Sequence, residues 1–140
     1  MRTAKLALGV LVGLLAAFGA GWLFGSSGRA AAERAHQEAQ VRGDLLDARA
    51  SVLAARVDLY NVNFGDASRH FEGAKASLRS AAERSKSGAT TSDPARIDSV
   101  IAQIDAAQQM AGRLDQGANA RAAAAAQAID DIVKGTGASK

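Results

Sequence analysis

An uncharged apolar run at the amino-terminal end constrains this chain more than any other feature. From Leu6 to Gly28 no residue carries a charge, and the run is longer than the roughly 20 residues that a helix needs to cross about 30 Å of hydrocarbon. Arg2 and Lys5 precede it as a short basic flank. We therefore predict a transmembrane signal anchor over residues 1–28.

Small residues recur at every fourth position of this run. Glycine inside a helix in water costs about 1 kcal/mol relative to alanine, so the regular spacing needs another explanation. Lipid gives helices no hydrophobic drive to associate, and close approach over small residues provides the attraction instead. We predict that the run packs against a transmembrane helix of another protein or of a second copy, through Gly9, Gly13, Ala17, Gly21 and Gly25.

A cleaved signal peptide is the alternative interpretation of the same run. MRTAK would be its basic leader and Ala17-Phe18-Gly19 its cleavage site, and the product would be a secreted helical binding protein of the periplasm. The apolar character continues to Phe24, beyond that site. We therefore favour an uncleaved single-pass anchor in a bacterial inner membrane, with the C-terminal domain in the periplasm.

The charge balance argues against nucleic acid as a partner. The chain has 17 Lys and Arg against 14 Asp and Glu. Arg2 and Lys5 are two of the 17, so residues 29–140 carry 15 basic against 14 acidic side chains. These charges alternate in sign and form no basic stripe for phosphates. We expect the partners to be a membrane and another protein.

Helices are the default for the rest of the chain, because aromatic residues are scarce and Pro94 is the one proline. Residues 29–44 have charge and alanine but little bulk, and we expect an exposed helical stalk there. Two adjacent apolar rows follow, which together predict the broad apolar face of a bundle helix. The first, at spacings of 4, 3, 4, 3 and 4, contains Leu46, Ala50, Leu53, Val57, Tyr60 and Phe64, and the second contains Leu45, Ala48, Val52, Ala55 and Leu59.

Two helical hairpins, over 45–84 and 93–134, are predicted to form a helical bundle over 45–134. Turn-prone residues at 61–66 divide the first hairpin, and the small polar stretch 85–92 separates the two. The predicted core of the first hairpin contains Leu53, Val57, Tyr60, Phe64, Ala67, Phe71, Ala74 and Leu78.

The second hairpin begins with a clear helix start. Asp93 is an N-cap residue and Pro94 occupies the first helical position, where its missing N–H costs nothing. Apolar rows follow on both of its helices, and a flexible tail is expected over 135–140. The rows contain Ile97, Ile101, Ile104, Gln108, Ala111 and Leu114 in the third helix, and Ala122, Ala126, Ile129 and Val133 in the fourth.

The stretch NFGDASRHFEGA resembles the turn and second helix of a tetratricopeptide repeat. In that family an aromatic residue follows the turn, and a small, an aromatic and a small residue recur after it, as Phe64, Ala67, Phe71 and Ala74 do here. The resemblance covers about residues 50–80, and no second copy follows at the family's period of about 34 residues. The fold class is therefore predicted as all-α, with an N-terminal transmembrane helix followed by either a four-helix bundle or a short tetratricopeptide-like solenoid.

Reactive groups are too few and too scattered to predict an enzyme, a cofactor or a metal site. The chain has no cysteine. Glu33 and His36 have the ExxH spacing of dinuclear metal bundles, but a second ExxH and two further carboxylates are missing. We interpret His36 and His70 as surface residues. The predicted function is protein–protein interaction, as an adapter or as a small accessory or structural subunit of a membrane complex.

Overall fold

The protein is described by a computed structural model that covers the backbone of residues 2–87 and 92–137 and the side chains of residues 28–87 and 92–136. It contains four helices: α1 (Arg2–Tyr60), α2 (Phe64–Lys86), α3 (Pro94–Gly112) and α4 (Gly117–Gly137). No strand occurs within those ranges, so the predicted all-α class is confirmed. The chain divides into two units, Met1–His36 and Gln37–Lys140.

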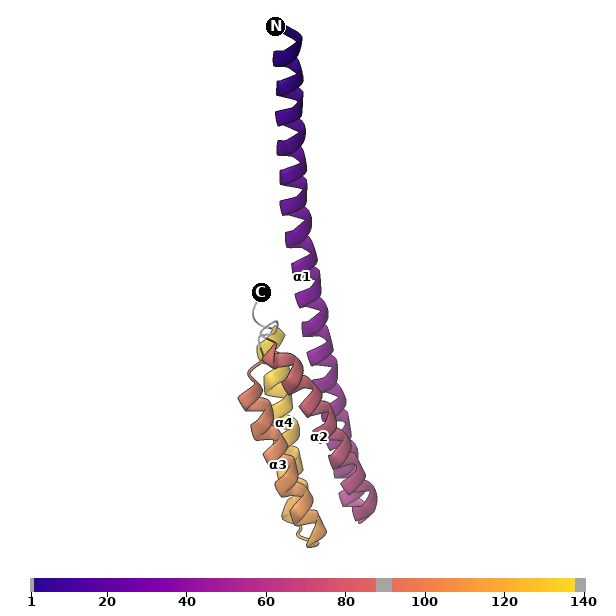
Figure 1. Cartoon of the computed structure of the whole chain (residues 1–140). Coiled ribbons are helices and arrows are strands. Elements are labelled where there is room, and N and C mark those ends of the chain that lie inside the picture. Colours follow the sequence, from indigo (N-terminus) through magenta and orange to yellow (C-terminus); the bar gives the residue numbers. More distant parts are fainter. Residues whose placement is uncertain (1, 88–91, 138–140) are drawn as a thin grey trace. The chain divides into compact units, whose positions relative to one another are not determined.

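The second unit is a four-helix bundle in which helices that follow one another in sequence run antiparallel (Figure 1). α3 packs against both α2 and α4. α1 is joined to α2 where Arg84 Nε donates to Asp44 Oδ2 at 2.9 Å, and to α4 where Arg56 Nε donates to Asn119 Oδ1 at 2.9 Å. Each helix therefore contacts two others around one shared core, as in the four-helix bundle that the sequence offered as one of two alternatives.

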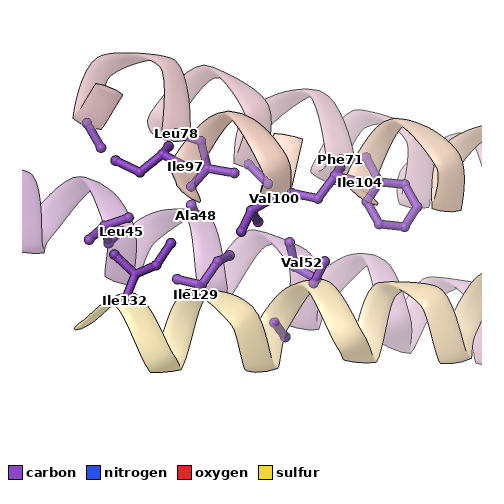
Figure 2. Packing of buried hydrophobic residues seen from close by; sticks show 14 of the residues in the cluster. Leu45, Ala48, Val52, Phe71, Leu78, Ile97, Val100, Ile104, Ile129 and Ile132 are labelled. Carbon is purple, nitrogen blue, oxygen red and sulfur yellow. The ribbon is translucent and has the colours of Figure 1, made fainter. Parts of the chain in front are cut away.

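The bundle core combines a few large side chains with many alanines (Figure 2). Phe71 is the largest fully buried residue, and Leu45, Leu78, Ile97, Ile104 and Ile129 are also fully buried. Each of these side chains removes more apolar area from water than an alanine does. Many of the other inward positions are small, which lets the helices approach closely. Ala48, Ala55, Ala67, Ala74, Ala81, Ala107, Ala122 and Ala125 are all at 0% exposure.

The helix starts follow from local sequence. The Asp93 side chain accepts a hydrogen bond from the Ala95 N–H at 2.9 Å, and Pro94 opens α3, which confirms the predicted start. The Asn63 side chain caps α2 in the same way by accepting from the Asp66 N–H. Both caps satisfy N–H groups that lack a partner in the first turn of a helix.

The choice of core row on α1 is where the sequence prediction was wrong. The bundle buries Leu45, Ala48, Val52 and Ala55, which belong to the second of the two rows. The first row faces outward: Val57 is 60% and Tyr60 83% exposed, so neither belongs to the core. Leu53 and Phe64 are half-buried, whereas Ala67, Phe71, Ala74 and Leu78 of α2 are fully buried as predicted.

Three predicted boundaries also need correction. Residues 28–36 are exposed, as expected for a stalk, but Val41 is already buried, so the bundle begins before residue 45. α2 continues to Lys86 with Ser85 buried, so its end lies inside the predicted loop 85–92. α4 continues to Gly137, so the predicted tail at 135–140 begins as helix. Val41 and Ser85 are buried although both stand among polar residues, which is why the sequence pattern placed the first two boundaries elsewhere.

A buried lysine joins α2 to α3. Lys75, whose side chain is 7% exposed, places Nζ 2.7 Å from Asp105 Oδ1 and 2.8 Å from Glu72 Oε1, and donates to Gln108 Oε1 at 2.9 Å. Gln108 in turn donates to Ser68 Oγ at 2.8 Å and to Glu72 Oε1 at 3.0 Å. Every donor of the lysine is therefore matched, as the burial of a charge requires.

This network shifts the pKa of two of its members. Burial by itself lowers the pKa of Lys75, but the hydrogen bonds to Asp105 and Glu72 outweigh burial and raise the pKa above its ordinary value. The hydrogen bonds from Lys75 and Gln108 lower the pKa of Glu72 below its ordinary value. Lys75 is consequently protonated and Glu72 ionised at neutral pH.

Truncation of the largest core side chain should destabilise the bundle strongly. We expect Phe71→Ala to lower the free energy of unfolding by about 3 to 5 kcal/mol, because the ring is fully buried and leaves a cavity. Arg79→Ala is the control, since that side chain is exposed on α2 and its truncation should cost about 0.5 kcal/mol or less. Urea unfolding of both variants tests this. Equal losses would contradict the burial of Phe71 in the core.

Removal of the buried ammonium should weaken the acid dependence of stability. The contribution of Glu72 is present above its unfolded-state pKa and is lost as the pH falls through the lowered pKa of the folded state. In Lys75→Met the main cause of that lowering is gone. The difference in unfolding free energy between the parent chain and this variant should therefore shrink as the pH falls from about 7 to about 3.

Urea unfolding at several pH values measures this difference. Lys86→Met is the control, because the Lys86–Glu83 pair lies on the surface and such pairs contribute little. A difference for Lys75→Met that stays constant over the range would contradict the role given to the network.

Candidate interaction surface

Large apolar side chains remain exposed in two places among the residues described with side chains. On α1 they are Leu46 at 45%, Val57 at 60% and Tyr60 at 83% exposure. In the turns they are Val62, between α1 and α2, and Leu114, between α3 and α4, each at 68%. Grouped exposed apolar residues are typical of surfaces that bind a partner, so both places are candidates for the functional site.

Val62 closes the end of α1 in a conformation that favours glycine. Its φ of 59° lies in the left-handed region. The Val62 N–H donates to the Leu59 carbonyl at 3.2 Å and the Asn63 N–H donates to the Asp58 carbonyl at 2.8 Å. These two bonds form a Schellman motif, in which the residue with positive φ is usually glycine.

Leu114 repeats this arrangement at the end of α3. Its φ is 58°. The Leu114 N–H donates to the Ala111 carbonyl at 3.0 Å, and the Asp115 N–H donates to the Met110 carbonyl at 3.0 Å. The predicted apolar row of the third helix included Leu114, and that assignment was wrong because α3 ends at Gly112 and the turn directs the side chain into solvent.

The two turns border one hollow. A cavity of about 180 Å³ is lined by apolar side chains from both turns, Val62 and Leu114, and by Leu59 and Phe64 beside them, with polar residues at its edge. We call these four residues the turn patch. A β-branched or bulky residue at positive φ lowers the stability of the folded state by about 1 to 3 kcal/mol. Two such residues, Val62 and Leu114, border the same hollow.

A second surface lies on α1, where four exposed side chains flank the half-buried Leu53. We call Leu46, Ala50, Leu53, Val57 and Tyr60 the outer row. Three of them, with Arg56 and Asn119, line a groove of about 350 Å³ between α1 and α4: Leu53, Val57 and Tyr60. The Arg56–Asn119 hydrogen bond lies in this groove, and these two side chains form its polar side.

The titratable side chains of the described residues offer little for catalysis. Lys75 is held as an ammonium and is enclosed by its partners, so it has no lone pair for nucleophilic attack. His70 Nε2 lies 3.4 Å from Asp58 Oδ2 at the surface, and His36 is exposed. No cluster of three or more His, Cys, Asp and Glu suited to a metal ion is found where the structure describes the chain.

The predicted membrane segment falls outside the region described with side chains. Gly9, Gly13, Ala17, Gly21 and Gly25 precede residue 28, where that description begins, so their packing role stays a prediction. Within the described part of the chain no helix has the length and apolar character to cross a bilayer.

Sequence reasoning did not single out the turn patch. Val62 and Leu114 carry no motif, and the signal that points to them is the presence of a bulky apolar residue where a helix-ending turn favours Gly or Asn. This signal can be recognised only when the last residue of α1 and the last residue of α3 are known.

No protein-family model, no curated protein and no solved structure matches this chain.

Polar replacements in the turn patch should stabilise the protein. We expect Val62→Asn and Leu114→Asn each to raise the free energy of unfolding by about 1 kcal/mol, because asparagine tolerates positive φ and the lost side chains are 68% exposed. Val57→Asn is the control, since Val57 is similarly exposed but lies within α1. Urea unfolding that shows equal losses at all three positions would contradict the strain assigned to the turns.

Proposed function

We propose that this chain is a single-pass membrane protein whose helical bundle binds another protein, as an adapter or as a small accessory subunit of a membrane complex. The observation that carries the proposal is the turn patch. Two separate turns each place a bulky apolar side chain in a conformation that disfavours it, and both leave that side chain exposed.

The argument from the turn patch is energetic. Asparagine or glycine at either position would relieve the backbone and remove apolar surface from water, so the observed residues are unfavourable on both counts in the free protein. Binding of an apolar partner surface offsets the second cost, because Val62 and Leu114 then leave the solvent. Backbone strain of this kind is found at ligand clamps and other functional sites.

The membrane part of the proposal rests on the sequence. The uncharged run from Leu6 to Gly28 is long enough to span, and its small residues at every fourth position suit packing against a neighbouring helix. A secreted protein released by signal cleavage is the alternative.

One preparation tests both parts. The full chain with a C-terminal tag is expressed, its membranes are washed with carbonate, and the retained protein is weighed by mass spectrometry. We expect the chain to be retained with its uncleaved mass, 14.3 kDa plus the tag. A shorter chain that starts near residue 20 and is released by carbonate would contradict the anchor and favour the secreted alternative.

The same membranes then test the patch. They are solubilised in mild detergent, and proteins that copurify with the tagged chain are quantified against the double variant Val62→Asn, Leu114→Asn. We expect the amount of copurified partner to fall by about tenfold or more with the double variant, which is expected to be at least as stable as the parent chain. Arg79→Asn on the outer side of α2 is the surface control. Equal copurification with all three chains would contradict the turn patch as the binding surface.

A further inference from the structure

We propose that a second copy of this chain covers the outer row of α1, and that the two copies pair in parallel and in register as a short coiled coil. This inference concerns a different surface from the turn patch. It holds whether or not the amino-terminal run is retained in a membrane.

The first argument is the spacing of the outer row. Leu46, Ala50, Leu53, Val57 and Tyr60 follow one another at 4, 3, 4 and 3 residues, which is the a/d spacing of a heptad repeat. A helix of 3.6 residues per turn drifts by about 20° per heptad from this repeat, so a seam of two heptads needs little supercoiling. The core of the bundle uses the neighbouring row of α1. Four members of the heptad row are exposed, and the central Leu53 is half-buried against the core.

The second argument is that this face differs from the rest of the bundle surface. The exposed large apolar side chains of the described residues lie on α1 or in the two turns. The exposed positions of α2, α3 and α4 are instead charged, polar or small, apart from those turns. An apolar seam confined to one helix fits one partner helix better than a broad or adaptable surface does.

The third argument is charge complementarity, which identifies the partner as a second copy. With Leu46, Leu53 and Tyr60 at d positions, Arg42 is a g residue and Asp47 is the e residue five positions later. In a parallel in-register pair, g of one copy lies beside that e of the other, so the dimer gains two Arg42–Asp47 pairs. Neither side chain forms an ion pair or hydrogen bond with another residue that the structure describes, and both are exposed.

The same charges select the parallel orientation. The g positions of this register are all arginines, namely Arg42, Arg49 and Arg56. An antiparallel pair would align the g positions of both copies on one flank and bring these arginines together. Arg49 and Arg56 are bound to Asp130 and Asn119 of their own α4, which leaves Arg42 to pair across the seam.

A seam of two heptads would be marginal between isolated peptides, because helix nucleation and ordering are costly. Here the bundle already holds residues 37–60 of α1 as helix, so pairing requires no folding. Pre-organisation of this kind removes a large part of the cost of association. If the chain is also anchored, confinement to one membrane raises the effective concentration of the second copy.

Single cysteines test the geometry cleanly, because the natural chain has none. Leu46→Cys, Tyr60→Cys and the control Ala102→Cys, which is exposed on α3, are each made in the full chain and oxidised in mild detergent. We expect disulfide-linked homodimers with Leu46→Cys and with Tyr60→Cys, and at least about fivefold less with the control. Crosslinking between mixed Leu46→Cys and Tyr60→Cys chains, with neither linking to itself, would show an antiparallel pair and overturn the proposal.

A charge exchange tests the identity of the contact. We expect Arg42→Glu and Asp47→Arg each to raise the dimer dissociation constant by about tenfold, because each turns two attractive pairs into repulsive ones, and the double variant to return it to within about threefold of the parent. Analytical ultracentrifugation in detergent measures the constant, and circular dichroism confirms that each variant is folded. A double variant no better than the single ones, or equal crosslinking by the Ala102→Cys control, would overturn the α1 seam while leaving the turn patch untouched.

Discussion

The bundle has one core, and it can bury only one of the two apolar rows that α1 carries. The buried row has Ala48 and Ala55 between larger residues, which lets α2 and α4 approach closely. It is also bordered by polar side chains that find partners on both sides: Asp44 binds Arg84 of α2, and Arg49 lies 2.5 Å from Asp130 of α4. This burial and these flanking contacts together determine which face of α1 is left for another molecule.

The sequence predicted those features of the helices that depend on neighbouring residues in the chain. The Asp93–Pro94 start and the buried positions of α2 follow from capping and from helical periodicity. Helical periodicity could not show which of the two rows of α1 is buried, because both rows are apolar. Leu59 is half-buried and Val57 is 60% exposed because of where α2 and α4 pack on α1. Leu114 was misplaced for a related reason: its spacing continues the row of α3, but the helix has already ended.

The candidate site was less accessible to sequence reasoning than the fold. Its evidence is backbone conformation, and a positive φ at Val62 or Leu114 cannot be deduced from residues whose usual preference is the opposite. The surface histidines were interpreted from the sequence, and the structure places both at exposed positions. Lys75 appeared in no motif, although it joins α2 to α3 through Asp105 and Gln108.

The buried alanines of the core limit which substitutions the bundle can accept. An alanine at 0% exposure has a single methyl group to lose, so shortening it costs little packing. Enlarging it to valine or leucine forces two helix axes apart, because the space around it was closed by that close approach. The side-chain volume at Ala48, Ala74, Ala107 and Ala125 therefore has an upper limit. Glycine would avoid the clash but would cost about 1 kcal/mol in each helix, so alanine is the residue that satisfies both requirements.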